Sequence, residues 1–210
     1  MSKVYPSNLT RDQYEFLSDL LPEAKPGGRP REVQLWTILN GIFYVLVEGV
    51  IWRALPGDFP PWQTVYTYFR NWRRDGTWLK IHHRLREWTR IEKERHKNPL
   101  EAIIDSQSVK TAAMVHRQVG DDAGKQIKGR KRFLAVDTLG LVLVAFVTAA
   151  QEPERAGGKQ LLQRVKALGQ QVWRLHTIWV DRGFDGSPFM RWVMDRCRWI
   201  VEVIRRHEQH

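Results

Sequence analysis

Residues 100–105 read Leu-Glu-Ala-Ile-Ile-Asp, a short apolar run that leads directly into a carboxylate. The helical hydrophobic period of the upstream sequence stops just before this run, so we predict a strand over Leu100–Ile104 that ends at Asp105. A second strand is predicted over Leu175–Val180, and it runs into Asp181 in the same way. Open α/β sheets tend to carry their chemistry at the carboxyl ends of strands, so both aspartates are candidate functional residues.

The elements around these two strands follow an order that indicates a known sheet topology. Residues 111–131 are polar and basic without periodicity, and residues 137–140 carry a hairpin turn signal. The other predicted elements are strands over Arg132–Val136, Leu141–Ala149 and Trp199–Ile204 and helices over Gly158–Gln171 and Phe189–Arg196. The resulting order, β-β-β-α-β-α-β, is that of the ribonuclease-H-like fold, where a three-stranded meander is extended by two crossover strands. The first and fourth strands are neighbours in that fold, so we expect Asp105 and Asp181 to lie close together.

The first half of the chain predicts helices. Thr10 and Gln13 fit a capping box at the start of one helix. Apolar residues from Leu35 to Leu46 recur with helical spacing, and two further helices are predicted around Val65–Trp72 and Trp78–Ile91. Charged residues between the apolar positions of the last helix predict one packed and one solvated face. These charged residues are Lys80, Arg84, Arg86, Arg90 and Lys93.

The break Lys97-Asn98-Pro99 divides the helical half from the mixed half of the chain. We therefore predict a helical, helix-turn-helix-like DNA-binding domain over residues 1–98. Residues 99–210 are predicted to form a mixed α and β domain of the ribonuclease-H-like class, α+β or α/β in its layering.

The charge balance favours a polyanionic partner. Thirty-four Lys and Arg residues oppose 23 Asp and Glu, for a net charge of +11 over 210 residues. Binding to nucleic acid is favoured by such a surplus, because neutralised phosphates release counterions; a merely soluble basic protein is the alternative. The single cysteine, Cys197, excludes an internal disulfide framework, and the first residues lack the apolar core of a signal peptide. No membrane association and no small-molecule substrate are expected, since apolar stretches are short and nucleotide-loop motifs are missing.

Two clustered aspartates suit metal-assisted chemistry on phosphodiesters. Such reactions are well served by two divalent ions roughly 3.5–4 Å apart, and Mg²⁺ and Mn²⁺ prefer hard oxygen ligands. Asp105 and Asp181 would supply a shared platform for both ions. A strand-terminal aspartate is also a common cap or turn residue, and this alternative stays open on the residues alone.

Five segments in order resemble insertion-sequence transposases of the IS5 type, in the IS4/IS5 superfamily. Residues 102–110, Ala-Ile-Ile-Asp-Ser-Gln-Ser-Val-Lys, resemble the first catalytic block of that family, and residues 121–140 resemble the basic segment and hairpin after it. Residues 178–186, Ile-Trp-Val-Asp-Arg-Gly-Phe-Asp-Gly, resemble the second block. Residues 28–31 and 55–66 are similar to the family's N-terminal domain. The resemblance covers essentially the whole chain.

The resemblance implies a transposase of the DDE type. Asp105 and Asp181 then correspond to its two catalytic, metal-binding aspartates, with two Mg²⁺ or Mn²⁺ ions expected in the complete enzyme. The implied partners are the terminal inverted repeats and target DNA, bound by a homo-oligomer in the bacterial cytoplasm at the nucleoid. Asp137 and Asp185 also match recurrent aspartates, but we interpret them as structural: Asp137 opens the hairpin turn, and Asp185 helps to start the next helix.

The chain departs from the family at its C-terminus. In the family a further helix presents a glutamate, and this sequence ends at His210, shortly after the last predicted strand. Glu202 is a possible substitute, but its β-branched neighbours favour a polar position on an edge strand. We therefore expect a C-terminally truncated, incomplete catalytic domain without the final helix, impaired in transposition; a non-catalytic DNA-binding remnant is the alternative.

Basic and hydrogen-bonding side chains mark three segments for contact with DNA. The best recognition-helix candidate begins at Gln63, because the N-terminal turn of such a helix meets base edges. The basic loop around Pro30 suits the minor groove or phosphates, and the basic insert after the first catalytic strand suits a phosphate track. A packing helix, a plain linker and a solvated loop are the respective alternatives. The predicted DNA contacts are Arg29, Arg31, Gln63, Thr64, Tyr66, Thr67, Arg70, Lys110, Lys125, Lys128, Arg130 and Lys131.

Overall fold

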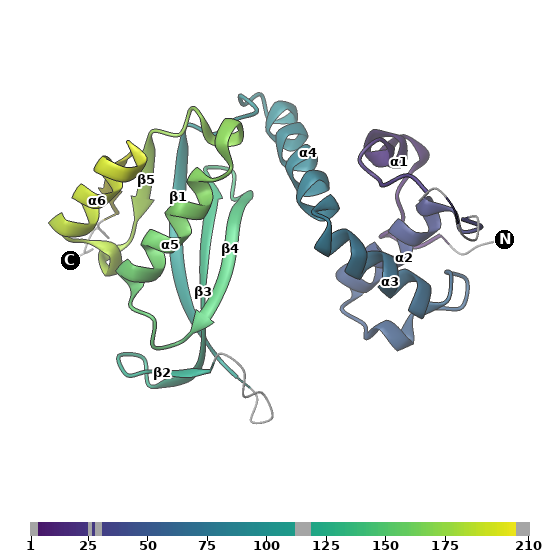
Figure 1. Ribbon diagram of the computed structural model, residues 1–210, viewed down its shortest axis with the longest axis horizontal. Coiled ribbons are helices and arrows are strands. Elements are labelled where there is room, and N and C mark those ends of the chain that lie inside the picture. Colours follow the sequence, from purple (N-terminus) through teal and green to yellow (C-terminus); the bar gives the residue numbers. More distant parts are fainter. Residues whose placement is uncertain (1–3, 25–26, 28–30, 112–118, 205–210) are drawn as a thin grey trace, which may run out of the picture. The chain divides into compact units, whose positions relative to one another are not determined.

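The computed structural model describes residues 4–24, 27, 31–111 and 119–204. The chain divides into two compact units, Met1–Leu85 and Arg86–His210 (Figure 1). Each unit has its own cluster of buried apolar side chains, so each is described here by itself. In the described part of the chain, no helix combines the length and the apolar character that crossing a bilayer requires.

Helix α4 (Thr77–Glu92) contains the division, which falls just before Arg86 and so precedes the predicted boundary at the Lys-Asn-Pro break. Arg86 Nη2 donates to Gln171 Oε1 at 3.2 Å. Arg90 Nη1 donates to Asp137 Oδ2 at 2.5 Å. Arg86 is 3% exposed and Arg90 is 4% exposed, so the prediction that these two arginines lie on a solvated face is wrong. The last turns of α4 belong to the second unit because both guanidinium groups bond there.

Local signals begin and end the helices of the first unit. The capping box is confirmed: Thr10 Oγ1 accepts the Gln13 N–H at 3.2 Å, and Gln13 Oε1 accepts the Thr10 N–H at 2.9 Å. Gly49 ends the second helix with a φ of 66°, a left-handed conformation that glycine adopts without strain. The elements before α4 are α1 (Arg11–Ser18), α2 (Leu35–Glu48), the short 3₁₀ helix η1 (Trp52–Ala54) and α3 (Trp62–Arg74). The core that these elements share with α4 consists of Leu17, Leu21, Ile38, Leu39, Ile42, Val65, Trp72 and Ile81.

The second unit contains one mixed sheet with the predicted topology and one short additional strand, Gly120–Asp122, in the segment that the sequence marks as aperiodic. Its strands are β1 (Glu101–Lys110), β2 (Gly120–Asp122), β3 (Ile127–Asp137), β4 (Val142–Ala149), β5 (Thr177–Val180) and β6 (Ile200–Val203). β3 pairs antiparallel with both β1 and β4, and β2 pairs with the beginning of β3. β5 pairs parallel with both β1 and β6. An antiparallel meander extended by two parallel crossover strands is the ribonuclease-H-like arrangement, so the predicted fold is confirmed.

The first strand is longer than the sequence predicts. β1 continues past Asp105 to Lys110, and Asp105 pairs with Leu134 of β3, so the prediction that the strand ends at Asp105 is wrong. β3 likewise begins at Ile127, inside the segment without periodicity. Antiparallel ladders are made by backbone groups, so two polar segments can pair without an apolar pattern in their side chains.

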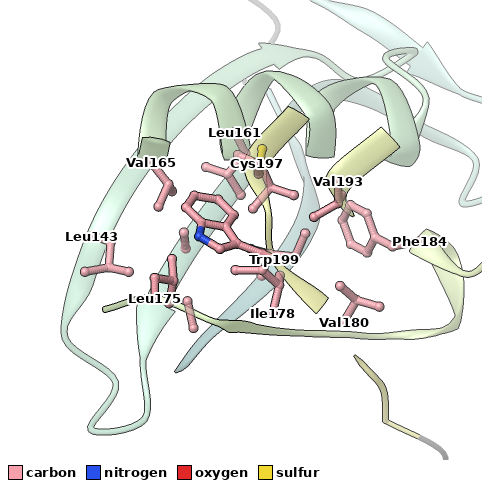
Figure 2. Close-up of a cluster of buried hydrophobic side chains, with 14 of the residues drawn as sticks. Leu143, Leu161, Val165, Leu175, Ile178, Val180, Phe184, Val193, Cys197 and Trp199 are labelled. Atoms are coloured by element: carbon pink, nitrogen blue, oxygen red, sulfur yellow. The ribbon is translucent and has the colours of Figure 1, made fainter. Parts of the chain in front are cut away.

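Two helices cover one face of this sheet. Helix α5 (Glu154–Lys166) packs against β3 and β4, and α6 (Ser187–Cys197) packs against β6; the short 3₁₀ helices η2 (Gly169–Val172) and η3 (Arg182–Phe184) lie in the connections. The Trp199 indole lies in the middle of this core, among side chains from both helices and from the sheet (Figure 2). Residues labelled around it are Leu161, Val165, Ile178 and Cys197.

Helix α5 approaches the sheet closely at Gly157. A Cβ placed on Gly157 would lie 2.0 Å from the Phe133 ring, which is fully buried in the core. We expect Gly157→Ala to lower the free energy of unfolding by about 1–3 kcal/mol, because an overpacked core must shift backbone or rotamers. Urea denaturation measures this, with Gly124→Ala as the control because its Cβ meets only an ordinary contact at 3.6 Å. Equal stability of the two variants would contradict the close packing.

Candidate active site

The sheet places the two predicted aspartates at the same level of neighbouring strands. In the parallel ladder Ala102 pairs with Ile178 and Ile103 with Trp179. Continuing this register by two residues brings Asp105 level with Asp181, just beyond the last paired residues. Both aspartates are exposed, whereas Ile104 next to Asp105 is buried in the core. The two aspartates thus come from neighbouring strands and lie at the same level, at one end of the β1–β5 ladder.

Asp181 is held by the turn that follows it. Its Oδ1 accepts the Gly183 N–H at 3.0 Å and caps η3, while Phe184 of that turn is buried in the core. The aspartate is therefore also a turn residue, as the alternative interpretation has it. Within the described residues this is the one hydrogen bond to the Asp181 carboxylate, and the residue is exposed.

The described residues contain no group of three His, Cys, Asp or Glu side chains that could hold a metal ion. Glu202 lies in the edge strand β6 opposite Trp179, and it is exposed, in agreement with its predicted strand position. A site at Asp105 and Asp181 offers only carboxylate oxygens, and such a donor set fits Mg²⁺ or Mn²⁺.

Asp137 has two structural roles: it closes the predicted turn, and it also pairs with a buried arginine, which its turn signal does not predict. Its Oδ1 accepts the N–H groups of Leu139 and Leu141, each at 2.9 Å, which closes the β3–β4 hairpin. Its Oδ2 accepts a hydrogen bond from Arg90 Nη1. The Nε of the same arginine donates to the His96 carbonyl at 2.8 Å. The role of Arg90 is not predictable from the sequence, since no local pattern marks a partner that is 47 residues away.

The environment of Asp137 includes a second buried arginine. Burial lowers the pKa of Arg86, and the nearby Asp137 carboxylate opposes that effect.

Asp185, the other aspartate interpreted as structural, does not cap the next helix. The N-cap residue of α6 is Gly186, which has no side chain to cap with.

Five of the predicted DNA contacts in the first unit lie along α3, with Thr64 and Tyr66 on different sides of the helix. Gln63, Tyr66, Thr67 and Arg70 are exposed there, and Thr64 is half-buried. Thr64 and Thr67 line a cleft of about 770 Å³ together with residues of the Pro22–Val33 loop, Arg31 among them. Arg31 Nη2 donates to the Pro22 carbonyl at 2.9 Å. Arg29 lies outside the described residues.

In the second unit, the predicted contacts lie at the end of the sheet where β2 joins β3 (Figure 1). Lys110, Lys125 and Lys128 are exposed, and Arg130 is half-buried. Lys125 Nζ lies 3.5 Å from Glu154 Oε1.

Lys131 has a different environment from the other lysines of the insert. It is 5% exposed, and its Nζ donates to the Glu152 carbonyl at 2.9 Å and lies 3.4 Å from Asp122 Oδ2. The Ser108 hydroxyl, 2.5 Å from Asp122, holds the pKa of that carboxyl below its usual value, so the ion pair is maintained. The prediction that Lys131 contacts DNA is contradicted, because alternation along β3 turns its side chain into the domain.

Fold and site together define a ribonuclease-H-like protein with paired aspartates on neighbouring strands. Residues 96–210 match the family described as transposase DDE domain, and the chain belongs to this family. Residues 9–82 match a family described as putative transposase of IS4/5 family, so the resemblance to IS4/IS5-type transposases is confirmed. Membership in the DDE family implies a general dependence on divalent metal.

Solved structures similar to the chain are also transposases. The Mos1 transposase paired-end complex with left transposon end is 12% identical, with a TM-score of 0.35, over 86% of this chain and 61% of that one. The piggyBac transposase synaptic complex with hairpin DNA is 14% identical, with a TM-score of 0.35, over 96% of this chain and 34% of that one. The chain therefore spans less than two thirds of either neighbour. No curated protein matches it.

Proposed function

We propose that the protein is a transposase that binds the terminal inverted repeats of its insertion sequence and cleaves and joins DNA with divalent metal. The observation that carries this proposal is that the strand register brings Asp105 and Asp181 to one level of the sheet in a chain of the DDE family. Two Mg²⁺ or Mn²⁺ ions are the proposed complement, with both aspartates as ligands.

The main contribution of Asp105 and Asp181 would be to hold divalent metal in a fixed place. A divalent ion bound by these carboxylates supplies activation of the attacking oxygen and stabilisation of the leaving oxygen. The backbone of Asp105 is held within the β1–β3 ladder and the carboxylate of Asp181 by the Gly183 N–H, so the positions from which both carboxylates extend are set before DNA binds. Oriented groups of this kind lower the barrier because little reorganisation is needed during reaction.

We further propose that the 210-residue polypeptide by itself binds DNA but is impaired in strand transfer. The supporting observation is that no group of three His, Cys, Asp or Glu side chains in the described residues is arranged so that it could hold a metal ion. A non-catalytic DNA-binding protein that occupies the same ends is the second candidate, and the same observation favours it.

A strand-transfer assay on labelled duplexes of the element's ends tests these proposals, with a complete IS5-type transposase as the positive control. Specific binding with weak, Mg²⁺-dependent cleavage that is lost in Asp105→Asn supports the impaired enzyme. Specific binding with no cleavage in Mg²⁺ or Mn²⁺ supports the second candidate. Absence of any preference for the element's ends would overturn both.

The exposed lysines of the second unit are proposed to bind phosphates. Each phosphate contact contributes about 0.9 to the slope of log K against log salt, so Lys110→Ala combined with Lys128→Ala is expected to reduce that slope by about 1.8. Fluorescence anisotropy of a labelled duplex over a KCl series measures the slope. Arg191→Ala, on the exposed face of α6, is the matched control and should leave it unchanged. An unchanged slope in the double variant would exclude these lysines as phosphate contacts.

A further inference from the structure

The first turn of α5 holds the segment that follows Asp181. A Cβ placed on Gly183 would lie 1.8 Å from Glu154 Oε2 and 3.2 Å from Asp181 Oδ1, so the two carboxylates flank this glycine. A Cβ on Gly158 would lie 2.7 Å from the Phe184 ring. Close contact between this turn and the Asp181 loop thus depends on glycine in both segments.

Glu154 also reaches the strand that carries Asp105. Its Oε1 accepts a hydrogen bond from Ser106 Oγ at 3.1 Å and lies 3.5 Å from Lys125 Nζ. Ser106 is 9% exposed and directly follows Asp105 in β1. The Glu154 side chain, 24% exposed, therefore connects the neighbours of both aspartates.

The contacts of Glu154 link the segments of the two aspartates at a level where the backbone ladder does not. The β1–β5 ladder ends at Ile103 and Trp179, two residues before the aspartates, so the backbone pairing of these two strands does not itself set their separation. We propose that Glu154 is a positioning residue that fixes the spacing of Asp105 and Asp181, which rests on the proposed metal-dependent function. It acts through Ser106 on one side and through the Gly183 turn on the other.

The ordinary role of an acidic residue at this position makes a different prediction. Glu154 is the first residue of α5, where a negative charge interacts favourably with the helix dipole. If this were the only role of Glu154, substituting it would leave the Asp181 turn unaffected. A direct ligand role would instead require the negative charge, whereas a positioning role requires an oxygen that accepts the Ser106 hydrogen bond.

Two substitutions separate these roles through Mn²⁺ binding, followed by electron paramagnetic resonance on the whole chain. Glu154→Ala is expected to weaken Mn²⁺ binding about tenfold or more, since loss of groups that orient metal ligands costs about 10–100-fold. Glu154→Gln keeps an acceptor oxygen and is expected to stay within about threefold of the unsubstituted chain. Asp195→Ala, an exposed acid on α6, is the control for loss of charge and should have no effect. Equal weakening by Gln and Ala, or no weakening by Ala, would overturn the proposal.

Hydrogen–deuterium exchange of residues 182–186 gives a second readout that needs no metal. Glu154→Ala should raise exchange of this segment about tenfold and leave exchange of the buried part of β3 unchanged, as local opening without global unfolding does. Glu154→Gln should restore protection. Unchanged exchange in Glu154→Ala would overturn the positioning role. If the unsubstituted chain fails to bind Mn²⁺ while the exchange result holds, the proposed metal-dependent function fails and the positioning of the turn stands.

Discussion

Asp181→Asn is expected to weaken Mn²⁺ binding to the chain by more than about a hundredfold, because even groups that merely orient metal ligands contribute about 10–100-fold. Asparagine has the same shape and keeps an oxygen for the Gly183 N–H, so the turn is preserved while the negative charge is lost. Asp105→Asn is expected to have a similar effect, since Asp105 lies level with Asp181 on the adjacent strand. Isothermal titration calorimetry with Mn²⁺ measures both.

The control for this prediction is Asp185→Asn. Asp185 is exposed, lies four positions further along the same loop and carries the same charge, but follows η3 at its C-terminal end. Asp185→Asn should change the Mn²⁺ affinity of the chain by no more than about twofold, because surface charges separated by solvent interact weakly. If Asp185→Asn weakens binding as much as Asp181→Asn does, general acidity of the loop explains the binding and a specific site at Asp181 is excluded.

Arg90→Met is expected to lower the free energy of unfolding of the second unit by about 3–5 kcal/mol, because it leaves a buried carboxylate without its counter-charge. Asp137 is fully buried, and Arg90 Nη1 approaches its Oδ2 at 2.5 Å. Methionine retains much of the apolar stem of arginine, so the decrease in the free energy of unfolding measures the contribution of the charge and the hydrogen bonds. Urea denaturation followed by circular dichroism measures it.

The same helix offers a matched control. Arg84 pairs with Asp19 at 2.9 Å, with 34% and 61% of the two side chains exposed, and Arg84→Met should cost at most about 1 kcal/mol. Adding Asp137→Asn to Arg90→Met should recover part of the loss, since the unpaired charge is removed while the turn N–H groups keep an acceptor. Similar losses for Arg84→Met and Arg90→Met would show that burial of the Arg90–Asp137 pair contributes nothing.

Patterns of short range predict most of the architecture. The capping box at Thr10, the helical periods of the first half and the short apolar runs before Asp105 and Asp181 depend on residues within a few positions of one another. The order of these elements predicts the sheet topology, because the connections available to a meander and two crossover strands are few. The two aspartates are predictable for the same reason, since each directly follows a short apolar run, although β1 continues beyond Asp105.

The environment of each charged side chain depends on contacts between distant segments. Arg90 and Lys131 read as solvated charges in the sequence, but the structure buries them against Asp137 and Asp122. Glu154 carries no signal of its role, because its partners Ser106 and Gly183 are brought together only when β1, α5 and the Asp181 turn pack. A charge is buried when a partner offsets its desolvation, and that partner is chosen by the three-dimensional arrangement of the chain. The sequence by itself thus determined the helices, the strand order and the positions of the two aspartates, whereas tertiary packing decided which charged side chains are buried in ion pairs and which remain exposed.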